Sequence, residues 1–386
     1  MLADVVPLYP LYALFFADSG MSDTEISALF AVWSVTGLLT EVPSGALSDR
    51  FPRRHVLGLG GVLQAGGYAV WLALPGFAGF AAGFVLWGIG TSLFSGTVEA
   101  LVFEGLSEAG VPELYPTVRG RITAAAHLTQ LPSAAAATLL FAAGAYAAAG
   151  WVSVGTCLAA AALAQTFPEP PRAGPPPDED AEPDGEPDRE RPSTAAPEAV
   201  GPGYLATLRV GVAEAAGLPL LRGALLAVAL VNGMDALEEY FPLIVGQGPG
   251  GAAIAAVPLL LLVVALAGAG GAGLGGRASR LGPLALAGVF GVAGLALGFA
   301  GAGGAAGLVA LGVFHGLQQC VLVVVDSRLQ ERVSGRARAT ATSVAALGAE
   351  IVALAVFAAW ALGGSPWIAV GTVAIAVLLP RVLRRG

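Results

Sequence analysis

The sequence predicts an all-α integral membrane protein whose twelve transmembrane helices form two pseudo-symmetric bundles of six. Three observations lead to this prediction. The chain is unusually apolar, long apolar segments recur from one end to the other, and the arginines fall on only one side of those segments.

The composition excludes an ordinary water-soluble protein. Of the 386 residues, 56% are hydrophobic and 12% are charged, whereas soluble domains carry about 25% charged residues. Lipid must therefore be the solvent for much of the chain. The net charge of -8 arises largely in residues 168–203, which hold ten acids and three arginines. Cys157 and Cys320 lie in apolar segments without metal-ligand spacing, and we expect neither a metal site nor a cofactor.

The apolar segments have the length of membrane-spanning helices. Such a helix needs about 20 mostly apolar residues, and proline, glycine and charged residues divide the chain into segments close to this length. The twelve predicted helices cover residues 2–17, 24–47, 55–74, 77–103, 119–142, 145–166, 219–245, 251–275, 283–301, 303–326, 339–362 and 365–383.

The arginines predict the topology. All 19 basic residues are arginines, a bias that suits a GC-rich bacterial genome. Basic residues stay on the cytoplasmic side of a membrane. We therefore expect an even number of helices, both termini in the cytoplasm, and a multi-pass protein of a bacterial cell membrane. The arginines group at residues 50–54, 119–121, 172–222, 277–280, 328–338 and 381–385, on one side of the predicted helices.

The two sets of six helices are predicted to be separate domains, residues 1–167 and 219–386. Between them, residues 168–218 are acidic and proline-rich and hold few large apolar side chains, which predicts a largely disordered cytoplasmic linker. A shift of 227 residues places the arginine pair after the second helix onto Arg277 and Arg280. Such matches indicate a parallel repeat, which is common among transporters.

The loop after the second predicted helix, residues 45–54, reads Gly-Ala-Leu-Ser-Asp-Arg-Phe-Pro-Arg-Arg. This stretch resembles the loop signature of the major facilitator superfamily, although Pro52 replaces a glycine of that signature. The resemblance implies two six-helix bundles around a central cavity. It also implies that this loop is a conformational latch between the halves, formed by Gly45, Asp49, Arg50, Arg53 and Arg54.

Two shorter stretches, residues 41–45 and 95–100, resemble a branch of the superfamily that contains multidrug and small-molecule exporters. Phe84, however, stands where proton-coupled drug exporters carry an arginine. The fifth helix has only Leu131-Pro132 where antiporters often carry a longer proline-glycine motif. Proton antiport is therefore not indicated by these motifs.

Ionisable residues at membrane depth are candidates for function because a charge in hydrocarbon is costly. On the seventh predicted helix, Asp235, Glu238 and Glu239 share one α-helical face. His315 and Glu350 lie near the middle of predicted helices ten and eleven. Like charges held close favour protonation of one of them. We therefore expect Asp235, Glu238, Glu350 and His315 to carry protons, with a relay between His315 and a carboxylate as one hypothesis.

These residues also have plainer interpretations. Glu238 and Glu239 lie late in their helix and can reach water at the membrane surface. His315 can be a neutral histidine that is hydrogen-bonded inside the bundle.

Two further groups of polar residues are candidates. Charged residues near the inner helix ends are expected to form a network, with Glu41 binding arginines of the loop. This network comprises Glu41, Glu99, Asp326, Arg119, Arg121, Arg336 and Arg338. Aromatic and hydrogen-bonding side chains at cavity-facing places are expected to contact the substrate. They are Tyr9, Tyr12, Trp33, His127, Gln130, Asn232, Gln318 and Gln319.

These features favour a secondary active transporter that moves a small, partly hydrophobic solute by alternating access, with proton-coupled export. A uniporter or importer on the same fold is the first alternative, and a non-transporting membrane scaffold or sensor is the second. We expect no enzyme, because no nucleophile–base pair, metal cluster or phosphate loop is visible. We also expect no nucleic-acid binding. The expected partners are the solute, protons and the lipid bilayer. The oligomeric state stays open, with a monomer favoured.

Overall fold

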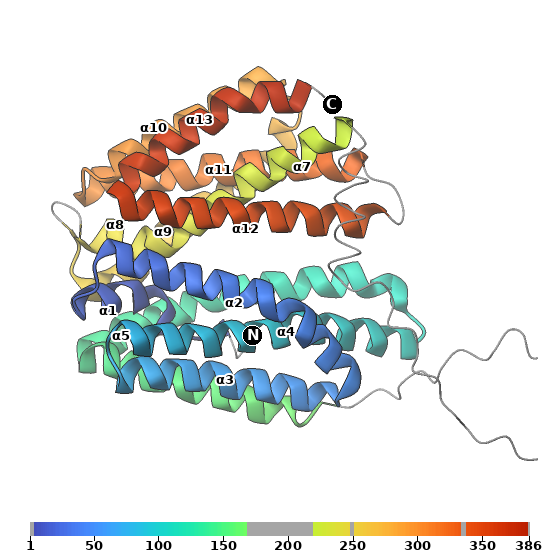
Figure 1. Ribbon diagram of the computed structural model, residues 1–386, viewed down its shortest axis with the longest axis vertical. Coiled ribbons are helices and arrows are strands. Elements are labelled where there is room, and N and C mark those ends of the chain that lie inside the picture. Colours follow the sequence, from blue (N-terminus) through green and yellow to red (C-terminus); the bar gives the residue numbers. More distant parts are fainter. Residues whose placement is uncertain (1–3, 168–218, 248–250, 333–336, 385–386) are drawn as a thin grey trace, which may run out of the picture.

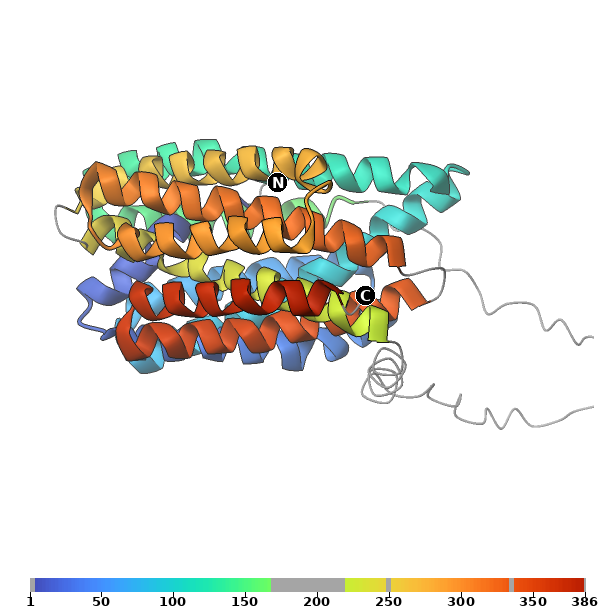
Figure 2. The ribbon, with the colours of Figure 1, turned by 90° about the horizontal axis from the view of Figure 1, so that it is seen from above.

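The computed structural model describes residues 4–167, 219–247, 251–332 and 337–384. The predicted linker and Arg336 therefore lie outside the described residues, as do the side chains of Asp49, His127 and Arg338. The described residues contain helices and turns and no strand. The helices run side by side in an N-terminal and a C-terminal half (Figure 1), and a view turned by 90° shows them along one common direction (Figure 2).

The N-terminal half begins with a short, broken segment. In chain order its elements are η2 (Tyr9–Leu11), α1 (Tyr12–Asp18), α2 (Asp23–Arg50), α3 (Arg53–Ala73), α4 (Phe77–Glu108), η3 (Pro112–Leu114) and α5 (Tyr115–Ala164). A capping box between Ser22 and Glu25 starts α2. Non-helical backbone at Gly144 and Ala145 divides α5, so α5 contains the fifth and sixth predicted helices.

The C-terminal half follows the same plan. Its elements are α7 (Pro219–Asn232), η4 (Gly233–Tyr240), α8 (Phe241–Gln247), η5 (Ile254–Ala256), α9 (Val257–Ala278), α10 (Pro283–Ala300), α11 (Gly304–Arg332), α12 (Ala337–Gly363) and α13 (Ser365–Arg384). Proline stands in the first turn of both α9 and α10, where its missing N–H costs nothing.

Eight helices in the described part of the chain are long and apolar enough to cross a membrane. One of them, Leu128–Ala164, contains the kink in α5 and therefore holds two of the predicted segments. The segments predicted at 2–17, 24–47 and 219–245 are not among the eight. The fold is nonetheless the predicted one: an all-α membrane protein with the twelve-helix arrangement.

Three of the predicted helices are not continuous α-helices: the first, the seventh and the eighth, which begins with the 3₁₀ turn η5. The first begins with turns and a 3₁₀ segment, because Pro7 and Pro10 interrupt an α-helical hydrogen-bond ladder. The seventh changes to 3₁₀ winding over η4. Pro242 has no N–H to donate to the carbonyl of Glu238, and the N–H of Phe241 bonds to that carbonyl instead.

Arginines cluster at the end of the molecule where α2, α4 and α11 finish, and we call it the arginine end. The two halves meet near the opposite end, which we call the closed end. Helices α2 and α12 pack together, as do α5 and α9. Near the closed end, the Tyr240 hydroxyl lies 2.8 Å from the Ser27 hydroxyl, and the Tyr240 ring stacks on Trp360 with centroids 4.1 Å apart. The Phe30 and Phe357 rings join α2 to α12 at 5.7 Å.

An aromatic cluster fills the N-terminal half near that closed end. The Phe16 and Phe80 rings lie 4.3 Å apart, and the Trp71 and Phe84 rings 4.8 Å apart. The Trp71 indole also donates to the Phe80 carbonyl at 2.9 Å. Phe84 is wholly buried here against Tyr12 as well. The position where proton-coupled drug exporters carry an arginine thus serves packing in this chain.

Candidate functional site

A cavity lies between the two halves and reaches toward the arginine end. Its volume is about 660 Å³, within the roughly 300–1,000 Å³ usual for small-molecule sites. Helices α2, α4, α7, η4 and α12 line it, and the exposed Thr342 and Ser343 lie near the start of α12. None of the described lining residues carries a positive charge. Its five carboxylates are those of Glu41, Asp235, Glu238, Glu239 and Glu350.

The 3₁₀ winding of η4 separates carboxylates that an α-helix would have kept on one face. In a 3₁₀ helix, residues three apart align, so Asp235 and Glu238 stay on one side while Glu239 turns away. The predicted single face of three carboxylates is therefore wrong. Each of the three side chains meets a different neighbour.

Asp235 faces two amides of α11. Its Oδ1 accepts hydrogen bonds from Gln318 at 2.6 Å and from Gln319 at 3.0 Å. Gln318 is wholly buried, and its Oε1 has no hydrogen-bond partner among the described atoms. The two amides therefore orient the Asp235 carboxylate at the wall of the cavity.

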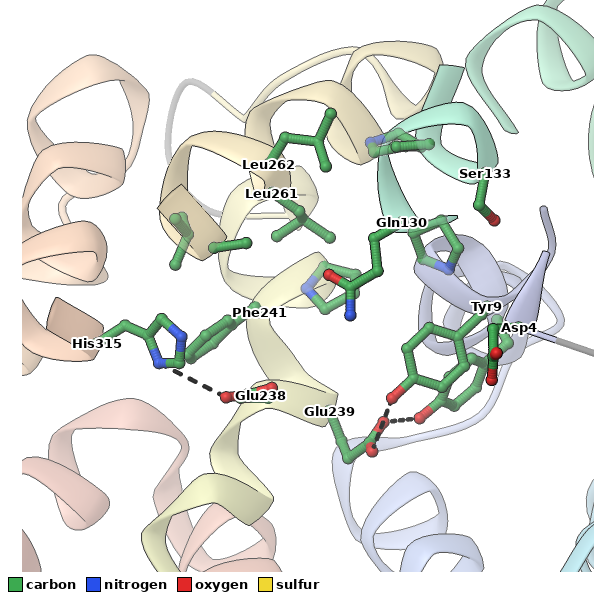
Figure 3. A pocket seen from close by; sticks show the side chains of 17 residues that line it. Asp4, Tyr9, Gln130, Ser133, Glu238, Glu239, Phe241, Leu261, Leu262 and His315 are labelled. Carbon is green, nitrogen blue, oxygen red and sulfur yellow. Dashed lines mark hydrogen bonds and ion pairs between the residues drawn. The ribbon is translucent and has the colours of Figure 1, made fainter. Parts of the chain in front are cut away.

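Glu238 faces His315. The His315 Nδ1 lies 3.6 Å from Oε1 of Glu238, and the imidazole packs edge-on against Phe241. His315 is 7% exposed, and its Nδ1 has no hydrogen-bond partner among the described atoms. Figure 3 shows this pair at one side of a second, smaller chamber.

Glu239 joins the two halves. The Tyr12 hydroxyl donates to Oε2 of Glu239, and the Tyr9 hydroxyl lies 3.4 Å from Oε1 (Figure 3). Glu350 makes a similar connection, because Ser34 on α2 donates to its carboxylate on α12. At the floor of the cavity, hydroxyl groups of the N-terminal half thus hold carboxylates of the C-terminal half.

An aromatic wall faces these carboxylates. Trp33 on α2 lines the cavity and stacks on Trp87 of α4, with ring centroids 5.2 Å apart and planes at 23°. Tyr9 lies against Trp87 at 6.2 Å. The cavity therefore has an aromatic wall in the N-terminal half, while four of its five carboxylates come from the C-terminal half.

The arginine end carries ion pairs inside the N-terminal half. Arg53 binds both carboxylate oxygens of Glu104 and donates to Ser48 at 2.9 Å. Arg119 pairs with Glu99. A side chain at Gly45 would meet open space, so no close helix contact requires this glycine in the present conformation.

The other predicted network residues are spread out. Arg121 and Asp326 are exposed, and Glu41 lines the cavity instead of pairing with a described arginine. Arg50 of the loop motif is exposed as well. In the C-terminal half, Arg328 donates to the backbone carbonyl of Leu281 at 2.6 Å.

The predicted solute contacts fall into two places. Trp33 and Asn232 line the central cavity, whereas Tyr9, Tyr12 and Gln130 line the smaller chamber. His315 and Glu350 are not in contact, because they lie on different walls with η4 between them. Sequence reasoning singled out Glu239 as part of the carboxylate face but did not place it among the proton carriers. It missed the following residues at these sites: Ser34, Trp87, Thr91, Ser92, Thr342 and Ser343.

A sequence model of the Major Facilitator Superfamily matches residues 2–356. None of the curated proteins matches this chain in sequence. Several solved structures share the fold. The nucleoside transporter NupG is 11% identical, with 99% of this chain and 96% of that chain covered and a TM-score of 0.68. A bacterial homologue of the human lysosomal transporter Spinster is 14% identical, with 99% and 89% covered and a TM-score of 0.65. A D-xylose–proton symporter is 16% identical, with 98% and 95% covered and a TM-score of 0.62.

Proposed function

Because this chain belongs to the Major Facilitator Superfamily, we propose that it is a secondary active transporter that exports a small, partly hydrophobic solute in exchange for protons. One observation carries the proposal. At the floor of the central cavity, Glu239 and Glu350 of the C-terminal half accept hydrogen bonds from Tyr12 and Ser34 of the N-terminal half. The same groups that can take up protons therefore hold the closed end together.

Alternating access follows from the distribution of contacts. Contacts between α2 and α12 close the cavity at one end, while the exposed Glu41, Thr342 and Ser343 line it near the arginine end. Rocking of the halves would exchange which end is open. We propose that the loop motif then joins the halves at the arginine end. Its members are Gly45, Asp49, Arg50, Arg53 and Arg54.

Protons would act on this closure through charge. A hydrogen bond to an ionised carboxylate is roughly twice as strong as a neutral one, so the protonation state of Glu239 and Glu350 would set how firmly the floor is held. Asp235 and Glu238 line the same cavity and would share the protons. If the arginine end is cytoplasmic, this conformation receives solute from inside, and protons entering from outside drive export.

The walls of the cavity favour a particular kind of solute. Acidic side chains attract positive charge and hydrogen-bond donors, and Trp33, which stacks on Trp87, offers a flat apolar surface that also attracts cations. A protonated or permanently cationic molecule with an aromatic part matches both walls. A solute that carries a positive charge would also compete with protons for the same carboxylates, which favours exchange over cotransport.

Uniport or import remains the second candidate. It is favoured by Phe84, which stands buried in the aromatic cluster where proton-coupled drug exporters carry an arginine. In that case the rate of solute transport would stay the same when the pH gradient is collapsed. A non-transporting scaffold would show no solute movement under any gradient.

Proton exchange in proteoliposomes tests the proposal. The solute probes are tetraphenylphosphonium and tetraphenylborate, which have the same size and opposite charge, and an internal dye reports pH. We expect the cation, and not the anion, to drive proton movement. This coupling is expected to be lost in Glu350→Gln and Asp235→Asn and kept in Glu108→Gln, an exposed residue outside the cavity. Cation flux without proton movement would contradict proton coupling.

A further inference from the structure

A second chamber of about 170 Å³ lies beside the central cavity, between α5 and α9. A water molecule occupies about 30 Å³ of liquid volume, so this chamber has room for a few waters. It is below the roughly 300–1,000 Å³ of small-molecule sites. Its size therefore suits a water-borne ion and excludes the solute proposed for the central cavity.

The chamber has one polar and one apolar wall. Gln130 and Ser133 of α5 and Tyr9 of η2 supply polar groups, while Leu261 and Leu262 of α9 supply the apolar side (Figure 3). Ordered water needs polar partners, and this lining provides them on the side that faces the carboxylates. The lining thus supports a short water-filled path to η4.

Two carboxylates of η4 divide the chamber from the cavity. Glu238 and Glu239 line both spaces, whereas His315 lines only the chamber. The His315 Nδ1 is buried without a hydrogen-bond partner and points at Glu238 across 3.6 Å. That distance is too long for a direct hydrogen bond. A shared water or a small side-chain movement would connect the two groups.

We propose that this chamber is the route by which the coupling proton reaches Glu238, separate from the path of the solute. The proposal rests on the proton coupling proposed above. A hydronium in the chamber gives its proton to a carboxylate oxygen of Glu238: one O–H bond of the hydronium breaks, one forms on Glu238, and water remains. His315 is a positioning residue that holds the carboxylate toward the chamber.

The titratable groups around Glu238 come from several elements, and none of those described is a lysine or arginine. They are Asp4, Tyr9 and Tyr12 of the N-terminal half, Asp235 and Glu239 of η4, Glu350 of α12 and His315 of α11. The wall contributed by α9 is apolar. Glu238 is the carboxylate that combines access to the chamber with the contact to His315, so it is the expected acceptor.

Infrared difference spectroscopy after a rapid jump to acidic pH tests the route without any solute. The purified full-length protein is used, and the carbonyl band of protonated Glu238 is assigned by its absence in Glu238→Gln. Ala265→Phe and Ser133→Leu fill the chamber from opposite walls, and Ala346→Phe fills the central cavity. Val263→Phe, on the exposed face of α9, is the matched control.

We expect the band to be lost, or its rise to slow, in both chamber variants and to rise as in the wild type in Ala346→Phe and Val263→Phe. His315→Asn should slow the rise with the fold intact by circular dichroism. Loss in Ala346→Phe alone, an unchanged rise in both chamber variants, or no Glu238 band in the wild type would overturn the inference. Failure of solute–proton exchange in proteoliposomes, with the band behaving as expected, would overturn the transport proposal and leave the proton route standing.

Discussion

Removing one hydroxyl group at the floor of the cavity should shift the balance between the two conformations. In Ser34→Ala, Glu350 loses the hydrogen bond that α2 donates to α12. Ser34 is buried, so no bulk water replaces it readily. A hydrogen bond to a charged group contributes about 1.5–3 kcal/mol in soluble proteins, and interhelical ones in membranes less. We therefore expect Ser34→Ala to destabilise the closed conformation by about 1–2 kcal/mol, which moves the equilibrium about 5- to 30-fold toward opening at the closed end.

Spin labels at Asp23 and Leu362, both exposed beside the closed end, measure this shift as a distance distribution. The Ser34→Ala variant should enlarge the long-distance population. Ser107→Ala is the control, because the Ser107 hydroxyl donates to the carbonyl of Phe103 in its own helix. Equal populations in the wild type and Ser34→Ala would refute the view that this contact holds the floor closed.

Three other substitutions probe the site. Gln318→Leu removes the amide that donates to the Asp235 carboxylate, and we expect it to lower the stability of the detergent-solubilised protein by about 1–3 kcal/mol. An unchanged thermal midpoint would contradict this. Trp33→Ala should weaken tetraphenylphosphonium binding about 2- to 10-fold by calorimetry, whereas Trp33→Phe and the exposed Trp151→Ala should not. Gly268→Ala places a methyl group against the His315 imidazole, and we expect slower protonation after a pH jump; wild-type kinetics would show that the ring simply moves aside.

The fold could be predicted from the sequence because membrane insertion depends on local properties of the chain. Helix length, apolar content and arginine position are each readable over about 20 residues. The break in the seventh helix was partly visible, since Pro242 removes one N–H, but the choice of 3₁₀ winding depends also on packing against α12. With that choice unknown, three carboxylates looked like one face, and the separate partners of Glu238 and Glu239 could not be foreseen.

The pairs that build the site are long-range and have no local signature. Tyr12 and Glu239 are 227 residues apart, and Ser34 and Glu350 are 316 residues apart. Hydropathy places His315 and Glu350 at similar depth, but depth alone does not say on which wall a residue lies. For Phe84, the departure from the exporter pattern was visible in the sequence. Its place in the aromatic cluster became visible only in the structure.

The 3₁₀ winding of η4 has a mechanical consequence. A 3₁₀ helix rises about 2.0 Å per residue and an α-helix 1.5 Å. The eight residues of η4 therefore extend about 4 Å further than the same residues would as an α-helix. Rewinding them would shorten this strut and swing its side chains around the helix axis by about 20° per residue. A single segment could in this way change both its length and the direction in which Glu239 points, while the helices on either side of it keep their shape.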